Sequence, residues 1–320
     1  MRRIDYDTEQ YQDYARGRAL TEQQLRAWIS AFGAVLPERR PLAGLDVGSG
    51  TGRFTPALAR AFGPVTGVEP SVRMREIAQA QSQDPGVRYL AGSAEEMPVP
   101  SGSADYALMF LSWHHVQDKP LAARELARVL RPAGRLLLRA NFSDHHPRPW
   151  WLEHFPRGFE ADAALFQPLH EVIATFTSAG WRVASFGTVT EPSSGTRGDM
   201  LERLRLRTLS FFAQLSPDEL EAGFRRLEQA VAADPGAPAP VFSEPLLTLE
   251  RSGARGRARS QHPAQSQISV AVDRIEGALR RPGELTATVT ATTATSPDQR
   301  HTSAVVNTCG NVPDLAGCHT

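Results

Sequence analysis

The sequence predicts an α/β fold: a doubly wound, mostly parallel, Rossmann-like sheet of seven strands with helices on both faces and a helical lid insertion. Two observations carry this prediction. Short apolar runs alternate with helical patterns over the first 250 residues, and that order is typical of a parallel sheet covered by helices. A glycine-rich stretch, LDVGSGTGR at 45–53, continues the first run. Such a loop brings backbone close to a ligand at the carboxyl edge of the sheet.

The first half of this pattern begins with a helix at Thr21. Gln24 stands three residues later and completes a capping box, and apolar residues follow at helical spacing at Leu25, Trp28, Ile29, Phe32 and Leu36. Strands are predicted at 44–47, 65–70, 87–92 and 105–111, with helices at 53–62 and 71–81 between the first three.

The second half continues with a helix at 120–130, a turn at 131–134 and a strand at 135–142. A further helix, which Gly180 ends, is marked by Leu169, Val172, Ile173 and Phe176. The last two strands are predicted at 181–187 and 241–250.

Two segments interrupt the alternation of strands and helices. Residues 143–165 are long and rich in His, Trp and Pro, and residues 196–232 have the pattern of two helices. We interpret both as a lid over the site, because loops on a rigid scaffold carry specificity. The alternative is that the second segment packs on the side of the sheet. The predicted domain spans residues 1–250.

Residues 251–320 are predicted to be a disordered tail. The aromatic residues Phe, Trp and Tyr all lie at or before Phe242, and Ala, Thr, Ser, Arg and Pro dominate afterwards. Such a segment cannot bury enough apolar area to offset its chain entropy.

Composition limits the classes of function. The 320 residues carry a formal net charge of zero, which argues against nucleic-acid binding by bulk electrostatics. No apolar run has the length of a membrane span, and the polar start MRRIDYDTEQ argues against a signal peptide. We therefore expect a cytoplasmic protein. The two cysteines, Cys309 and Cys318, fit neither a disulfide framework nor a zinc site, and no metal is expected.

The glycine loop alone does not identify its ligand. No lysine follows it, so a Walker-type nucleotide triphosphatase is excluded. In the dinucleotide pattern G-x-G-x-x-G, Gly48 and Gly50 fit, but Arg53 takes the third position and Gly52 comes one residue early. Glu69 ends the second predicted strand, where a carboxylate accepts hydrogen bonds from ribose hydroxyls.

The order of these pieces resembles the class I S-adenosylmethionine-dependent methyltransferases, in the small-molecule branch that includes the ubiquinone/menaquinone methyltransferases. The resemblance covers roughly residues 10–190. The matching stretches are LDVGSGTG (45–52), VTGVEPSVRM (65–74), GSAEEMPVP (92–100), SADYALMFLSWHHV (103–116) and ELARVLRPAGRLLL (125–138).

The resemblance implies S-adenosylmethionine as the cofactor and a role for each matching position. Backbone at Gly48, Ser49, Gly50 and Gly52 would pack against the methionine moiety and ribose, and Asp46 would orient the loop and contact the amino group. The remaining cofactor contacts implied are Glu69 on the ribose hydroxyls, Pro70 and Met74 beside the adenine, Ser93, Ala94 and Glu95 after the third strand, and Leu111 and Ser112 beside the amino-acid end. Ser93 stands where the family usually has an aspartate, which makes a stronger acceptor.

An aromatic residue before the first helix closes over the cofactor in this family. Tyr11, Tyr14 and Arg18 are the candidates here; we assign Tyr11 and Arg18 to the cofactor and Tyr14 to the acceptor. The alternative is a solvated arm without a role.

Histidines supply the candidates for acid–base chemistry. His114 and His115 follow the fourth predicted strand and are the candidate catalytic residues, because histidine acts as a base near neutral pH. The family often has a histidine there without a catalytic role. His145, His146 and Trp150 lie after the fifth strand and are assigned to the acceptor pocket.

The function predicted is transfer of the methyl group of S-adenosylmethionine to a small-molecule acceptor at O, N or C, by in-line displacement. The alternatives are a catalytically silent S-adenosylmethionine-binding regulatory protein and a dinucleotide-dependent oxidoreductase. The acceptor, its reacting atom and the oligomeric state do not follow from the sequence.

Overall fold

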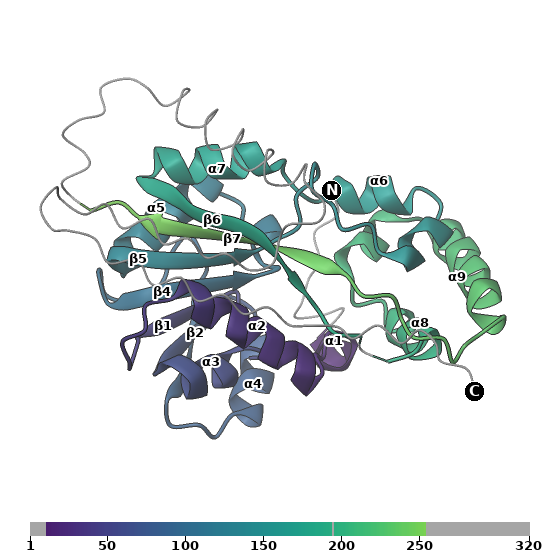
Figure 1. The fold of residues 1–320 in the computed structure, drawn as a ribbon, viewed down its shortest axis with the longest axis horizontal. Helices are drawn as coiled ribbons and strands as arrows, with labels where there is room; N and C mark the ends of the chain where they lie inside the picture. The colour runs from purple at the N-terminus through teal and green to yellow at the C-terminus, as the bar shows by residue number, and fades with distance from the viewer. Residues whose placement is uncertain (1–10, 194, 254–320) are drawn as a thin grey trace, which may run out of the picture. The chain divides into compact units, whose positions relative to one another are not determined.

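Seven strands form one sheet, as predicted. They are β1 (Gly44–Val47), β2 (Val65–Glu69), β3 (Val87–Ala91), β4 (Ala104–Phe110), β5 (Leu130–Arg139), β6 (Trp181–Thr190) and β7 (Ser243–Arg251). The strand order in the sheet is β3-β2-β1-β4-β5-β7-β6. The first five strands pair in parallel and β7 is antiparallel to both neighbours, so the sheet is mostly parallel (Figure 1).

This computed structural model describes residues 11–193 and 195–253, without the side chains of residues 11 and 12. The described residues all belong to one compact unit. The tail predicted at 251–320 lies outside the described residues except at 251–253. None of the helices in the described part is long and apolar enough to cross a membrane.

Helices cover both faces of the sheet (Figure 1). One face carries α2 (Glu22–Val35), α3 (Thr55–Phe62) and α4 (Val72–Gln81), and the other carries α5 (Lys119–Val129) and α7 (Leu169–Ser178). Strand β4 is buried along its whole length between them. Its Leu108 packs with Trp28 of α2, while its Met109 packs with Leu126 of α5. This burial on both faces explains why β4 reads as a continuous apolar run.

The predicted capping box at the start of α2 is confirmed. The Thr21 side chain accepts a hydrogen bond from the backbone of Gln24, and the Gln24 side chain accepts one from the backbone of Thr21. The turn predicted at 131–134 is instead the irregular first part of β5, where Ala133 has a φ of 61°. Pairing with β4 jumps there, from Ala104 with Leu130 to Tyr106 with Arg135, because the extra residues loop out of the ladder.

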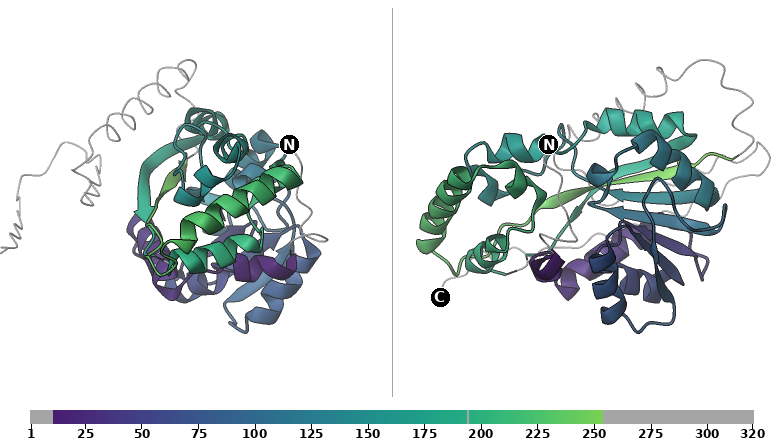
Figure 2. Two further views of the ribbon diagram at one scale, coloured as in Figure 1. Left: turned by 90° about the vertical axis from the view of Figure 1, so that its right-hand side faces the viewer. Right: turned by 180° about the vertical axis from the view of Figure 1, so that it is seen from behind.

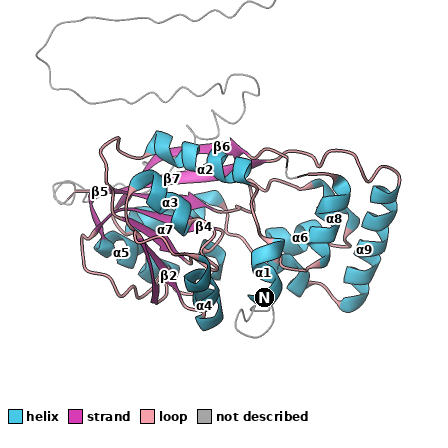
Figure 3. Ribbon diagram, turned by 90° about the horizontal axis from the view of Figure 1, so that it is seen from below, coloured by secondary structure: helices cyan, strands magenta, loops and turns pink. Residues whose placement is uncertain are grey.

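The two interrupting segments pack together into a layer of their own, which we call the helical cap (residues 150–165 and 196–232). It contains η2 (Trp150–His154), α6 (Gly158–Ala163), α8 (Arg197–Arg205), η3 (Ser210–Gln214) and α9 (Pro217–Ala232). The cap has a separate apolar core centred on Phe155, Phe211, Phe212 and Phe224. Figures 2 and 3 show it beside the sheet, with α1 (Tyr11–Gly17) next to α8.

Candidate active site

The glycine loop between β1 and α3 adopts a conformation that only glycine takes without strain. Gly48, Gly50 and Gly52 have φ values of 71°, 55° and 79°, in the left-handed region. A Cβ at Gly48 would lie 2.5 Å from the Cβ of Ser112, so glycine also permits the end of β4 to approach. The loop therefore presents bare backbone at the carboxyl edge of the sheet.

Glu69, the last residue of β2, ties this loop to the next one. Its Oε2 accepts a hydrogen bond from the backbone N–H of Gly50 at 2.9 Å, and its Oε1 accepts one from Ser71 N–H at 3.0 Å. Glu69 is buried, yet it lines the cavity above the loop. A carboxylate has about four lone-pair sites, so it retains acceptor capacity toward that cavity.

A cavity of about 380 Å³ lies over the glycine loop. Residues from the carboxyl ends of β1, β2, β3 and β4 line it, as expected for a doubly wound sheet. The predicted residues that line it are Gly48, Gly50, Glu69, Pro70, Met74, Ser93, Ala94, Glu95, Leu111, Ser112, Tyr14, His114 and His115. Leu165, Ser210 and Gln214 of the helical cap contribute the opposite wall.

Three residues of β1 and the glycine loop that were predicted for the cofactor do not line this cavity: Asp46, Ser49 and Gly52. Buried Asp46 accepts a hydrogen bond from Thr55 Oγ1 at 2.7 Å, which fixes the first turn of α3 against β1. Burial raises the pKa of Asp46 to about 6. Ser49 Oγ is buried without a hydrogen-bond partner among the described residues. A Cβ at Gly52 would meet Tyr89 Oη at 2.3 Å.

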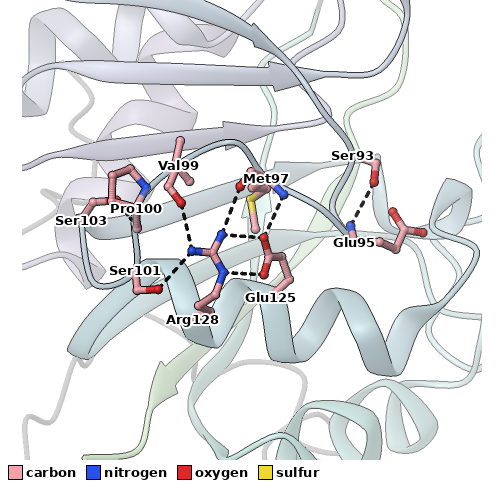
Figure 4. Close-up of polar contacts among 9 residues, drawn as sticks. All are labelled: Ser93, Glu95, Met97, Val99, Pro100, Ser101, Ser103, Glu125 and Arg128. Carbon is pink, nitrogen blue, oxygen red and sulfur yellow. Dashed lines mark hydrogen bonds and ion pairs between the residues drawn. The ribbon is translucent and has the colours of Figure 1, made fainter.

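The loop after β3 is fixed by a cluster of polar contacts (Figure 4). Arg128 of α5 donates hydrogen bonds to the carbonyls of Met97 and Val99, and it pairs with Glu125 at 2.6 Å. Glu125 in turn accepts from the backbone N–H of Met97 at 2.9 Å, and Arg128 lowers the pKa of Glu125. This brace holds the segment that places Ser93 and Glu95 at the cavity.

Glu95 joins the loop after β3 to the loop after β4. Its Oε1 accepts hydrogen bonds from the backbone N–H groups of Gln117 at 2.8 Å and Asp118 at 3.3 Å. Ser93 Oγ accepts from the N–H of Glu95 at 3.2 Å. Both side chains therefore shape this end of the cavity.

The end of β4 combines strained backbone with a buried histidine. Leu111 has a φ of 56°, which for a branched side chain is a strained conformation of the kind found at functional sites. Ser112 Oγ donates to the carbonyl of Val47 at 2.8 Å. Burial holds the pKa of His114 well below its ordinary value, and His115 and Arg18 lower it further. His114 is therefore neutral, and its Nδ1 has no hydrogen-bond partner in the described part of the chain.

A second cavity of about 210 Å³ adjoins the first. Tyr14, Leu111, His114 and His115 line both cavities. Arg18, predicted for the cofactor, lines only the second. The side chain of Tyr11 lies outside the described residues.

Sequence reasoning did not assign three arginines that line the second cavity: Arg53, Arg139 and Arg203. Arg53 is the last residue of the glycine-rich stretch and Arg139 ends β5. Their positions at the carboxyl edge of the sheet were therefore a signal that these two arginines lie near the site. Arg203 lies in the helical cap, and no pattern in the sequence places it near the sheet.

His145, His146 and Trp150, which were predicted to face the acceptor, line neither cavity. His146 lies 2.6 Å from Asp162 through Nε2 and accepts from Arg148 N–H through Nδ1, so both ring nitrogens are engaged. His145 Nδ1 lies 3.1 Å from Asp144. The indole of Trp150 packs under the guanidinium of Arg197. Within residues 11–193 and 195–253, no group of three His, Cys, Asp or Glu side chains is arranged to hold a metal ion.

The central part of the chain is similar to known methyltransferases. Residues 45–138 match the family model described as a methyltransferase domain. An uncharacterized methyltransferase of Mycobacterium tuberculosis is 37% identical over 131 residues, which are 41% of this chain and 50% of that protein. A demethylmenaquinone methyltransferase of Staphylococcus aureus is 32% identical over 119 residues, 36% of this chain and 49% of that protein. The chain thus spans about half the length of the curated relatives it matches.

A solved structure shares the fold over a longer stretch. A putative methyltransferase from an antibiotic biosynthesis pathway of Anabaena variabilis has a TM-score of 0.59 and 24% identity, and it covers 71% of this chain and 99% of its own. That likeness concerns the fold alone.

Proposed function

We propose that this chain transfers the methyl group of S-adenosylmethionine to a small-molecule acceptor. The match of residues 45–138 to the family model described as a methyltransferase domain supports this proposal. The observation that carries the proposal is the hydrogen bond from Gly50 N–H to Glu69 at the wall of the cavity of about 380 Å³. In the proposed complex, the Glu69 carboxylate accepts hydrogen bonds from the ribose hydroxyls, and the bare backbone beside it contacts the methionine end. The cytoplasmic location expected from the sequence also remains a proposal.

The residues present fit this cofactor. Gly48 and Gly50 line the cavity with left-handed backbone and place no side chain between the loop and a ligand. In the proposed arrangement Glu69 holds the ribose, Met74 and Pro70 flank the adenine, and Ala94 and Glu95 lie at its far edge. Leu111 and Ser112 border the methionine end, where Tyr14 covers the loop.

When bound, the cofactor supplies a sulfonium methyl group that an acceptor atom displaces in line. The protein then has to align the acceptor and exclude water, and such positioning supplies about 7–11 kcal/mol. In our proposal the helical cap closes the acceptor side through Leu165 and Ser210, which line both cavities. His114 is the candidate base, because it is neutral, lines both cavities and has an unpartnered Nδ1 among the described residues.

The test is calorimetric titration of the purified chain with S-adenosylmethionine, S-adenosylhomocysteine and NADH. We expect dissociation constants on the order of micromolar for the first two ligands and no binding of NADH. Binding of NADH alone would contradict the proposal and support a dinucleotide oxidoreductase. Release of S-adenosylhomocysteine in the presence of an acceptor separates an enzyme from a catalytically silent binding protein.

A further inference from the structure

The second cavity has an unusual concentration of arginine. Four arginines line its volume of about 210 Å³: Arg18, Arg53, Arg139 and Arg203. The cavity shares Leu111 and His114 with the first cavity. If the first cavity holds the cofactor, as the proposed function requires, the second is the space in which the acceptor lies.

Only one of the four arginines is neutralised by an ion pair. Arg139 is buried, pairs with Glu244 and donates to Asn141 at 2.7 Å. Arg18, Arg53 and Arg203 have no carboxylate oxygen within 4.0 Å among the described residues. Their positive charge therefore remains available to a ligand.

The carboxylates of the second cavity are already bonded to other partners. Glu191 accepts hydrogen bonds from the neutral side chains of Trp28 at 2.7 Å and Gln24 at 3.2 Å. Asp162 lies 2.6 Å from His146. With Glu244 paired to Arg139, the carboxylates of Glu191 and Asp162 remain beside three unpaired arginines, so the lining of the cavity carries one positive charge in excess.

The three guanidinium groups retain unused donors. Arg53 donates to the carbonyl of Arg18 at 2.8 Å, and Arg203 donates to the carbonyl of Ala19 at 2.9 Å. The Nε of Arg18 is buried and has no partner within the described part of the chain. A guanidinium has five N–H donors in a fork that matches carboxylate and phosphate groups. Arg18 also lowers the pKa of Arg53, Arg203 and His114, after the larger effect of burial, so it lies among all three.

Part of the remaining wall of the second cavity is apolar. Phe110, Leu111 and Trp151 line it together with Phe166 and Leu204. A ligand that fits this wall and the arginines has an apolar body and one anionic end.

We infer that the methyl acceptor is an anionic small molecule, whose carboxylate or phosphate group is bound by Arg18, Arg53 and Arg203 in the second cavity. Its apolar body lies against Phe110 and Trp151. The reacting atom is then directed toward Leu111 and His114, where the two cavities meet.

The experiment measures binding of benzoate, of its neutral analogue benzamide and of inorganic phosphate to the full chain, with and without saturating S-adenosylhomocysteine. We expect benzoate to bind at least tenfold more tightly than benzamide. Competition by inorganic phosphate at concentrations similar to benzoate indicates a phosphate acceptor, and weak competition indicates a carboxylate acceptor. Equal binding of benzoate and benzamide would overturn the inference.

Variants locate the anion. Arg18→Gln and Arg203→Gln are each expected to abolish the preference for benzoate. Arg16→Gln is the matched control, because Arg16 is an exposed residue of α1, two positions before Arg18, and pairs with Asp13; this variant should keep the preference. Retention of the preference in both test variants would refute the assignment. If the unmodified chain does not bind S-adenosylhomocysteine, the proposed function is refuted instead. The two failures can be distinguished, because anion binding is also measured without S-adenosylhomocysteine.

Discussion

The backbone N–H of Gly50 donates a hydrogen bond to Oε2 of Glu69 across 2.9 Å. This bond joins the loop after β1 to the end of β2, and the second oxygen of Glu69 holds Ser71 at the start of α4. One side chain thus sets the relative position of two loops that line the same cavity. A change at Glu69 is expected to alter both the shape of the site and the hydrogen-bond acceptors that the site offers.

Glu69→Ala is expected to weaken binding of S-adenosylhomocysteine by roughly 100-fold, because hydrogen bonds to a charged group contribute about 1.5–3 kcal/mol each. Glu69→Gln keeps one acceptor oxygen and should show a smaller loss. Calorimetry measures both, with Glu76→Ala as control, since Glu76 is a surface residue paired only with Arg73. Unchanged affinity in the alanine variant would remove Glu69 from the site.

The Arg128 brace leads to a second prediction. Arg128→Ala removes the donors to the Met97 and Val99 carbonyls, so the loop that carries Ser93 and Glu95 should loosen. We expect cofactor affinity to fall about tenfold, or about 1.4 kcal/mol, without loss of fold. Arg124→Ala is the control, because Arg124 is an exposed residue of the same helix. Equal effects of the two substitutions on calorimetric affinity would contradict the role of the brace.

His114 provides a test of the chemistry. If it accepts the acceptor's proton, His114→Gln should lower kcat by about 10²–10⁴-fold, while S-adenosylhomocysteine affinity changes less than about twofold. The pKa of His114 lies well below its ordinary value, so the group is already deprotonated at neutral pH. The rate should therefore show no inflection from this histidine near its ordinary pKa of about 6.5. An unchanged kcat in the variant would show that the reaction needs no base at His114.

The sheet followed from the sequence because each strand is short, apolar and bounded by turns or helices. The residues at the carboxyl ends of the strands, including Gly48, Glu69 and Leu111, followed from the same alternation. The second cavity did not, because its arginines come from the turn after α1, the glycine loop, β5 and the helical cap. Only tertiary packing brings these segments together, so no local pattern in the sequence predicts the cavity.

The histidine assignments show the same limit. His146 follows β5, so its position in the chain put it near the acceptor. The structure instead engages both its ring nitrogens, with Asp162 and the backbone of Arg148. The sequence contains no signal that pairs His146 with Asp162, which lies 16 residues away in α6.

Asp46→Asn is expected to stabilise the ligand-free protein at neutral pH. Burial raises the pKa of Asp46 from 3.8 to about 6, so the folded state favours the protonated carboxyl. That contribution to stability is complete below about pH 4 and is lost as pH rises through about 6. At pH 7.5 the folded protein therefore carries a buried charge, which asparagine removes while still accepting from Thr55.

The free energy of unfolding, measured with denaturant, should rise by about 1–3 kcal/mol in Asp46→Asn at pH 7.5, since one pKa unit is about 1.4 kcal/mol. The gain should shrink toward zero near pH 4. Asp234→Asn, at an exposed position, should show no such pH-dependent gain. A gain that stays constant with pH would contradict the assignment of the effect to ionisation of Asp46.

Gly223 tests whether the helical cap works as a packed unit. A Cβ at Gly223 would lie 2.1 Å from Cδ1 of Phe155, whose ring is enclosed by Phe211, Phe212 and Phe224 at centroid distances of 5.2–5.5 Å. Alanine in a helix normally stabilises by about 0.5–1 kcal/mol relative to glycine, so a loss of stability reports the clash.

We expect Gly223→Ala to destabilise the protein by about 1–3 kcal/mol, as overpacking does, and to lower acceptor turnover while S-adenosylhomocysteine affinity is kept. The double variant with Phe155→Leu should recover part of the stability, because the smaller side chain makes room for the new methyl group. Gly187→Ala is the control, since a Cβ there would meet no atom within 4 Å. The helical cap also contributes Leu165, Ser210 and Gln214 to the wall of the first cavity. If Gly223→Ala lowers cofactor affinity as much as turnover, packing of the cap also supports this wall, and the cap does not act on the acceptor side alone.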